Sequence, residues 1–130
     1  MSISTVQESE MPSAYGVFTI VRTRVPAEGT GQFVLLAAGR HPKCRLVSAQ
    51  VVATIYSTAA DVIAIEHDDG VNVATATASA TIGTPVAMTI APADSRGAVF
   101  ARDEAVMMVA STQGNAANAT TVQATFETVN

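Results

Sequence analysis

Cysteine and histidine, the side chains most often used for nucleophilic and metal chemistry, are few in this 130-residue chain. The single cysteine, Cys44, follows His41 by three residues, a spacing that would allow a thiol–imidazole pair. The neighbouring cations Lys43 and Arg45 would lower the pKa of this thiol. A small, half-buried residue at the start of a strand is the simpler interpretation of Cys44, and we prefer it. With one cysteine, the chain cannot form an internal disulfide.

The second histidine precedes several oxygen-bearing side chains. His67 is followed by Asp68 and Asp69, and Asn72 lies close behind them. A two-histidine metal site with one of these aspartates, or a calcium site on their oxygens, are the alternatives that these residue types suggest. The sequence has neither the ligand spacing of zinc sites nor the twelve-residue calcium loop. We therefore expect a solvated turn here and no metal.

Other catalytic signatures are missing from the sequence. Gly29-Thr30-Gly31 is a lone glycine pair with no helical pattern after it, so it does not predict a phosphate cradle. No Gly-x-Ser-x-Gly motif occurs, and no pair of carboxylates can be assigned to a glycosidase mechanism. We expect a protein that is not an enzyme and needs no cofactor.

Charge is sparse and unevenly placed. Charged residues make up 14% of the chain, and the net charge is −4. Five of the seven basic residues nevertheless fall between residues 22 and 45: Arg22, Arg24, Arg40, Lys43 and Arg45. Ordinary surface charge is one interpretation, and a basic stripe that docks on an acidic partner is the other. The acidic balance argues against a nucleic-acid partner.

The ends and the hydropathy of the chain suggest neither export nor membrane insertion. No run of 18 apolar residues is present, so we expect no membrane association. The first residues lack the positive start and apolar stretch of a signal peptide, so we expect synthesis in a cytoplasm.

The elements that must position these residues are predicted to be strands. The chain has 24 Ala, 17 Val and 16 Thr but only 3 Leu and 1 Lys, which favours strands over helices. Period-two alternation or short β-branched runs bounded by turn residues predict strands in nine segments. They are residues 15–25, 33–38, 45–56, 62–67, 71–80, 86–90, 98–101, 105–111 and 120–129.

Three of these segments also predict which side chains share a face. In the first, Tyr15 and the Val and Thr residues at the odd-numbered positions up to 25 share one face, and Arg22 and Arg24 lie on the other. In the third, Val47, Ala49, Val51, Ala53 and Ile55 share a face. In the last, Val122, Ala124 and Phe126 are predicted to point inward, with Thr121, Gln123, Thr125 and Glu127 outward.

We therefore predict an all-β fold, a jelly-roll-like β-sandwich of about eight antiparallel strands. Asp68-Asp69-Gly70 between two β-branched runs predicts a hairpin. Residues 15–130 form the single domain, and the polar residues 1–14 form an extended arm. We expect this arm to bind a partner through Val6, Gln7, Glu8 and Glu10.

The pattern of these segments resembles the head decoration, or cement, proteins of tailed bacteriophages. The resemblance lies in the alternating strand at residues 46–55, the hairpin at 62–76 and the late turn and strand at 100–112. Arg102-Asp103 stands where the late turn of such proteins is often Gly-Asp. No catalytic residue is carried over by the resemblance.

The resemblance implies a structural role in a virion. It implies that the chain, as a homotrimer, binds the outer surface of an assembled capsid and bridges neighbouring major capsid protein subunits. The arm and the five basic residues would make the contacts. The alternative is a tail-fibre or receptor-binding domain, or a carbohydrate-binding one, although the chain has no Trp and only six aromatic residues on which sugars could stack.

Overall fold

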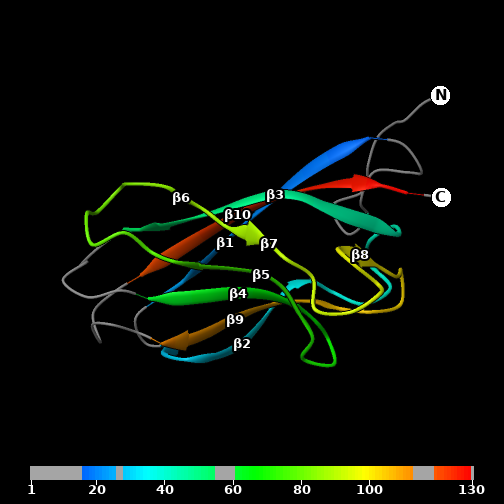
Figure 1. Ribbon diagram of the computed structural model, residues 1–130, viewed down its shortest axis with the longest axis horizontal. Helices are drawn as coiled ribbons and strands as arrows, with labels where there is room; N and C mark the ends of the chain where they lie inside the picture. Colours follow the sequence, from blue (N-terminus) through cyan, green and yellow to red (C-terminus); the bar gives the residue numbers. More distant parts are fainter. Residues whose placement is uncertain (1–15, 26–27, 55–60, 113–118, 130) are drawn as a thin grey trace.

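The computed structural model describes residues 16–25, 28–54, 61–112 and 119–129 of the chain. Strands make up 58% of these residues, and none of them is in an α-helix. The strands form two antiparallel five-stranded sheets that stack as two layers of a β-sandwich (Figure 1). No helix in the described ranges has the length and apolar character needed to cross a bilayer. The all-β prediction is therefore confirmed.

The first sheet, which we call sheet A, forms one layer of the sandwich. Its strand order is β1-β10-β3-β6, and the short strand β8 pairs with the start of β3. The bounds of its strands are β1 Val17–Arg24, β3 Cys44–Ala53, β6 Val86–Ala87, β8 Val99–Phe100 and β10 Thr120–Thr128.

The second sheet, sheet B, forms the other layer, with the order β2-β9-β4-β5-β7. Its strands are β2 Gly31–Leu36, β4 Val62–His67, β5 Asn72–Thr77, β7 Thr89–Ile90 and β9 Val106–Thr112. Apart from the β4–β5 hairpin, every consecutive pair of strands lies in different sheets. The strands at both ends of the sequence, β1 and β10, are hydrogen-bonded neighbours.

Local sequence explains most of these elements. The predicted hairpin forms: β4 and β5 pair across the Asp-Asp-Gly turn, where Gly70 has a φ of 90° that an L side chain rarely adopts. The alanine-rich segment is also a strand, although β5 covers only Asn72–Thr77 of the predicted residues 71–80. Within it Ala74 is buried while Thr75 and Thr77 face solvent. Here the alternating pattern outweighs the helix propensity of alanine.

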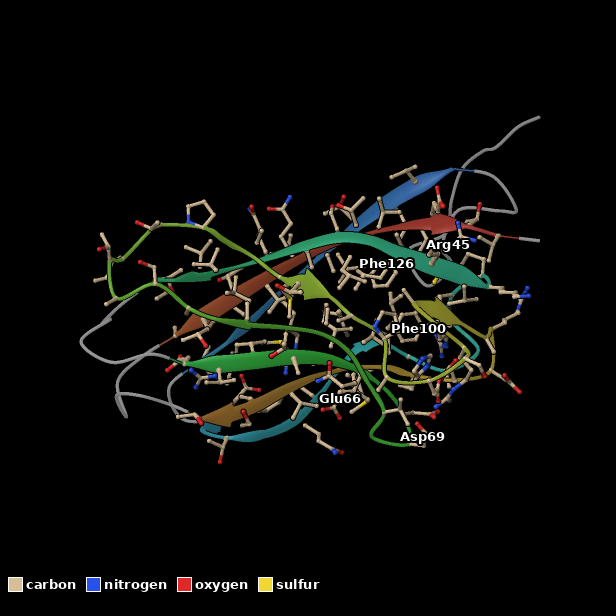
Figure 2. All side chains as sticks on the ribbon, in the orientation of Figure 1. Arg45, Glu66, Asp69, Phe100 and Phe126 are labelled. Carbon is tan, nitrogen blue, oxygen red and sulfur yellow. The ribbon has the colours of Figure 1, made fainter. Side chains whose placement is uncertain are left out.

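A chain of aromatic rings lies at the centre of the core. Phe18 of β1 stacks on Phe126 of β10 with ring centroids 5.5 Å apart, and Phe126 meets the edge of Phe100 at 6.1 Å. Phe100 in turn lies 4.7 Å from the ring of His67. Figure 2 shows Phe126 and Phe100 between the two layers. These contacts join sheet A to β4 of sheet B.

The first strand, β1, points its valines to solvent and one of its arginines into the core, the reverse of what the hydropathy of these residues favours. Val17 and Val21 are 65% and 61% exposed, whereas Arg24 at the other end of β1 is fully buried. Arg22 shares the inner face and is partly covered. The prediction that Arg24 contacts a partner protein is therefore wrong. Its side chain is instead buried against another residue of the same chain.

That residue is Asp61, which immediately precedes β4. The Nη2 atom of Arg24 donates to Oδ2 of Asp61 at 2.5 Å, and both side chains are completely buried. The hydroxyl of Thr120, the first residue of β10, donates to the same carboxylate oxygen. Arg24 Nε and Nη1 have no hydrogen-bond partner in the described part of the chain. One buried ion pair thus connects β1 and β10 of sheet A with the residue that precedes β4 of sheet B.

The third strand differs from its predicted face at one position. Its register with β10 shifts between the Thr125–Ser48 and Phe126–Leu46 pairs, which leaves Val47 as the extra residue of a β-bulge. Val47 is therefore 47% exposed, while Ala49, Val51 and Ala53 share one face as predicted, and that face is buried. The inward and outward faces predicted for β10 are confirmed.

Removal of the Asp61 carboxylate is expected to be strongly destabilising. Asp61→Asn leaves the Arg24 charge buried without a counter-ion, so it should reduce the free energy of unfolding by about 3–5 kcal/mol. The double variant Arg24→Met/Asp61→Leu removes both charges and should recover most of that loss. Chemical denaturation of the three proteins measures both values. A double variant no more stable than Asp61→Asn would contradict this account.

Candidate interaction surface

The five clustered basic residues do not form one stripe in space. Arg24 is buried, and Arg22 extends over the ring of Phe33, with its guanidinium carbon 5.4 Å from the ring centroid. Arg22 also binds Glu28 at 3.0 Å. Hydrogen bonds from Val25 N–H and from Arg22 lower the pKa of Glu28. Arg22 is therefore committed to contacts within its own domain.

The remaining three basic residues belong to the opposite end of the strands. Arg45 pairs with Glu127 at 2.7 Å across β3 and β10, and the same row ends at Val17. Arg40 and Lys43 are exposed on the loop before β3. The interpretation of one continuous basic stripe is therefore wrong. The candidate arm residues Val6, Gln7, Glu8 and Glu10 lie outside the described residues.

A different surface is continuous and nearly uncharged: the side of sheet A that points away from sheet B. We call it the outer face of sheet A. The pairing of β1, β10, β3 and β6 places four rows of side chains across it. From one end these rows are Val17–Glu127–Arg45, Thr19–Thr125–Ser48, Val21–Gln123–Gln50–Ala87 and Thr23–Thr121–Val52, with Val47 on the bulge.

The polar groups of this face bind one another. Thr19 and Thr125 hydroxyls are 3.1 Å apart, and those of Thr23 and Thr121 are 2.8 Å apart. Gln50 Nε2 donates to Gln123 Oε1 at 3.2 Å. The one ion pair of the face, Arg45 with Glu127, is likewise internal to it. Such a surface carries little free charge and loses little hydration when it is covered.

Exposed valines give the outer face its apolar character. Val17, Val21 and Val47 are three of the six large hydrophobic residues that are clearly exposed in the described chain. A shallow hollow of about 260 Å³ lies beside them, lined by Ser48, Ala49, Gln50, Ala87, Gln123 and Thr125. Its lining has amide, hydroxyl and methyl groups and no ionisable side chain. The arrangement suits contact with another protein surface.

The sequence predicts which side chains share this face. It does not predict that the face is exposed, because that depends on contacts between residues that are distant in sequence. The Val–Thr alternation at residues 17–23 predicts a continuous face, and it is the face of the valines that is exposed. The outward residues of β10 were predicted. Their neighbours on β1 and β3 become recognisable only when the burial of Arg24 and the bulge at Val47 are known.

The aspartates that the sequence offered as alternative metal ligands have protein partners at the far end of the sandwich. Asp69 binds Arg96 at 3.0 Å, and Asp68 accepts a hydrogen bond from Ala105 N–H at 3.2 Å. Hydrogen bonds from Arg96 lower the pKa of both Asp69 and Asp94, so these pairs weaken as the pH falls and the carboxylates are protonated. Within the described ranges, no three His, Cys, Asp or Glu side chains are grouped closely enough to hold a metal ion.

Cys44 is a buried thiol at the first position of β3. It is inaccessible to solvent, and its Sγ lies 3.8 Å from Nδ1 of His41. Burial, with a smaller contribution from the charge of Glu104, raises the pKa of Cys44 to about 12. The expectation that Lys43 and Arg45 would lower this pKa is wrong, because both extend into solvent while the thiol points into the core.

The Cys44 thiol is expected to be unreactive in the folded protein. At pH 8 an aromatic disulfide reagent should label the native protein far more slowly than it labels a free thiol, because the nucleophilic thiolate is scarce and shielded. The same reagent should label one thiol per chain in denaturant. Rapid stoichiometric labelling of the native protein would show that Cys44 is accessible and acidic after all.

Comparison with models of known protein families and with curated proteins finds no match for this chain.

Proposed function

We propose that the chain is a structural virion protein that binds the outside of an assembled phage capsid and stabilises it by bridging major capsid protein subunits. The observation that carries this proposal is the outer face of sheet A. It is a broad, nearly uncharged surface with exposed valines, of the kind that packs against another protein. The resemblance of the sequence to capsid decoration proteins supplies the partner.

The strand order supports a jelly-roll arrangement for this protein. The strands pair in a nested series from the ends of the chain inward: β1 with β10, β2 with β9, β3 with β8 and β6, and β4 with β5. A long hairpin rolled into two sheets gives such a series, and jelly rolls are common in capsid proteins. Lectins and cupins use the same fold, so the fold alone does not specify the function.

The chemistry of the outer face indicates how it would hold a capsid. Its side chains offer methyl groups, hydroxyls and amides, and its one ion pair is satisfied internally. Docking would therefore depend on packing and on hydrogen bonds of neutral side chains, and it would change little with ionic strength. A protein that binds only the assembled lattice stabilises that lattice by its binding free energy at every occupied site.

The proposal also covers the oligomeric state and the N-terminal arm. We propose a homotrimer at three-fold or quasi-three-fold positions, with residues 1–14 laid along a neighbouring subunit. Several linked contacts raise the occupancy of a particle well beyond that of a single contact. Both features come from the resemblance and from the polar sequence of the arm, which lies outside the described residues.

Two valines provide a matched test of the docking face. Val21 is exposed on β1 at the edge of sheet A, and Val34 is exposed on β2 at the edge of sheet B. Val21→Lys places a charge in the proposed contact and should weaken binding to undecorated capsids of the source phage at least about tenfold. Val34→Lys makes the same change on the opposite layer and should bind like the wild type. Co-sedimentation with capsids measures both.

The result is interpretable only for folded variants, so circular dichroism and denaturation of both proteins accompany the binding assay. Equal binding of the two folded variants would remove the outer face of sheet A as the docking surface. Failure of the wild-type protein to bind any capsid of its phage, together with binding to a host glycan, would favour the receptor-binding alternative.

The homotrimer makes a separate prediction. One chain has a mass of 13.3 kDa, so sedimentation equilibrium at micromolar concentration should give a species about three times heavier. Trimer formation should persist in Val34→Lys. A species of 13.3 kDa at all concentrations, both free and after release from capsids, would contradict the trimer.

A further inference from the structure

The turn between β4 and β5 contains a peptide that can undergo a chemical rearrangement. Asp69 is followed by Gly70, and it is the only aspartate in the chain that precedes a glycine. A carboxyl group in this position can be attacked by the glycine nitrogen, because the next residue has no side chain that blocks the approach. A Cβ atom added to Gly70 would meet no other atom within 4 Å, so no neighbouring segment packs against this residue either.

The reactive pair lies at the exposed tip of the hairpin, where Figure 2 labels Asp69. The side chain of Asp69 is 54% exposed. Its Oδ1 accepts a hydrogen bond from Val71 N–H at 3.3 Å, which folds the carboxyl group back over the residue that could attack it. An exposed carboxyl group and a glycine nitrogen therefore meet in one turn.

Closure of a succinimide ring is the reaction that this arrangement allows. The nitrogen of Gly70 forms a bond to Cγ of Asp69, and the amide hydrogen leaves with the carboxyl OH as water. Water then opens the ring. Attack at Cγ restores aspartate, whereas attack at the main-chain carbonyl carbon leaves the chain running through the side chain, which is isoaspartate. The water that was lost is regained, so no further reactant is needed.

Arg96 holds the Asp69 carboxylate from the turn at residues 94–97. Its Nη2 donates to both oxygens, at 3.1 Å to Oδ1 and 3.0 Å to Oδ2. Asp94 fixes the same guanidinium, and its Oδ2 accepts from Nη2 at 2.8 Å and from Nε at 3.0 Å. The hydrogen bond from Arg96 is also the main cause that lowers the pKa of Asp69. Arg96 thus restrains the carboxyl group and keeps it as the carboxylate, which loses an oxygen less readily than the acid.

The backbone of the turn restrains the attacking nitrogen. Gly70 N–H donates to His67 O at 3.0 Å, and His67 N–H donates to Val71 O at 2.9 Å. Ring closure requires the Gly70 amide to lose its proton and to turn toward the carboxyl carbon, so these hydrogen bonds oppose it. Arg96 restrains the other reactant, and it can be replaced without a change in the sequence of the turn.

We propose that Asp69–Gly70 is a site of spontaneous isoaspartate formation and that Arg96 slows this modification by holding the Asp69 carboxylate. Isoaspartate adds a methylene group to the main chain and removes the carboxyl group from its present position. The product therefore loses both the geometry of the hairpin turn and the ion pair that joins it to residues 94–97. The inference is independent of the capsid proposal, because it concerns only contacts within one chain.

Prolonged incubation of the full-length protein tests this role. Wild type and Arg96→Gln are kept at 37 °C and pH 6, and isoaspartate at position 69 is measured by electron-transfer mass spectrometry of protein digests, which distinguishes the two isomers. Loss of the ion pair frees the carboxyl group, so isoaspartate should form in Arg96→Gln about five times faster than in the wild type, or more. Circular dichroism of each sample accompanies the measurement, because only folded protein is compared.

Arg102→Gln is the matched control. Arg102 is exposed on the turn before β9 and forms no ion pair with the described residues, so this variant should keep the wild-type rate. Sodium chloride at about 1 M screens the exposed ion pair and should raise the wild-type rate, which tests the proposal even if Arg96→Gln does not fold.

Three results would overturn the proposal. One is an equal rate in the wild type and folded Arg96→Gln, which includes the case in which neither forms isoaspartate at position 69. Another is a wild-type rate that salt leaves unchanged. The third is an equal acceleration in Arg102→Gln, because the effect would then come from the loss of any positive charge at this end and not from the contact of Arg96 with Asp69.

Discussion

The buried ion pair between Arg24 and Asp61 determines how the rest of the sandwich is arranged. Side chains alternate along a strand, so the burial of Arg24 sends the odd-numbered residues of β1 outward. A shift of one residue would expose the inner aromatic Phe18 and bury Val21 instead. The outer face of sheet A, with its valines and threonines, therefore follows from a charge pair that lies 37 residues apart in sequence. A buried pair contributes little net stability after its desolvation cost, but it makes the alternative register expensive.

Polar side chains are buried at both ends of the sandwich, and they have different hydrogen-bond partners at each end. At one end a permanent cation is matched by a carboxylate and the hydroxyl of Thr120. At the other, the buried rings of His67 and His41 contact the carboxyl and the backbone carbonyl of Glu104. Between them the core is apolar and includes the stacked ring of Phe126. Polar groups thus occupy the places where the chain crosses between the sheets, and small aliphatic and aromatic residues fill the layer between.

The sequence predicts the elements well and their partners poorly. The strand positions, the hairpin at Gly70 and both faces of β10 follow from local alternation and turn chemistry, which act within a few residues. The orientation of β1 does not, because Asp61 is remote from Arg24 in sequence. The bulge at Val47 depends on pairing with β10, again a distant segment. For the same reason the spacing of basic residues suggests a stripe that the fold does not assemble, and no sequence pattern places both histidines on Glu104.

The nested pairing of strands also constrains when the outer face of sheet A can exist. In that sheet β10 lies between β1 and β3, and the residues that it joins are far apart in sequence. Thr19 and Thr125 are 106 positions apart, and Gln50 and Gln123 are 73 apart. On the ribosome, β1 lacks β10, the strand it pairs with in the described part of the chain, until β10 has left the exit tunnel. Contacts of such separation form late and slowly. The outer face of sheet A therefore forms only after β10 has been synthesised, and a chain that lacks β10 has no continuous outer face.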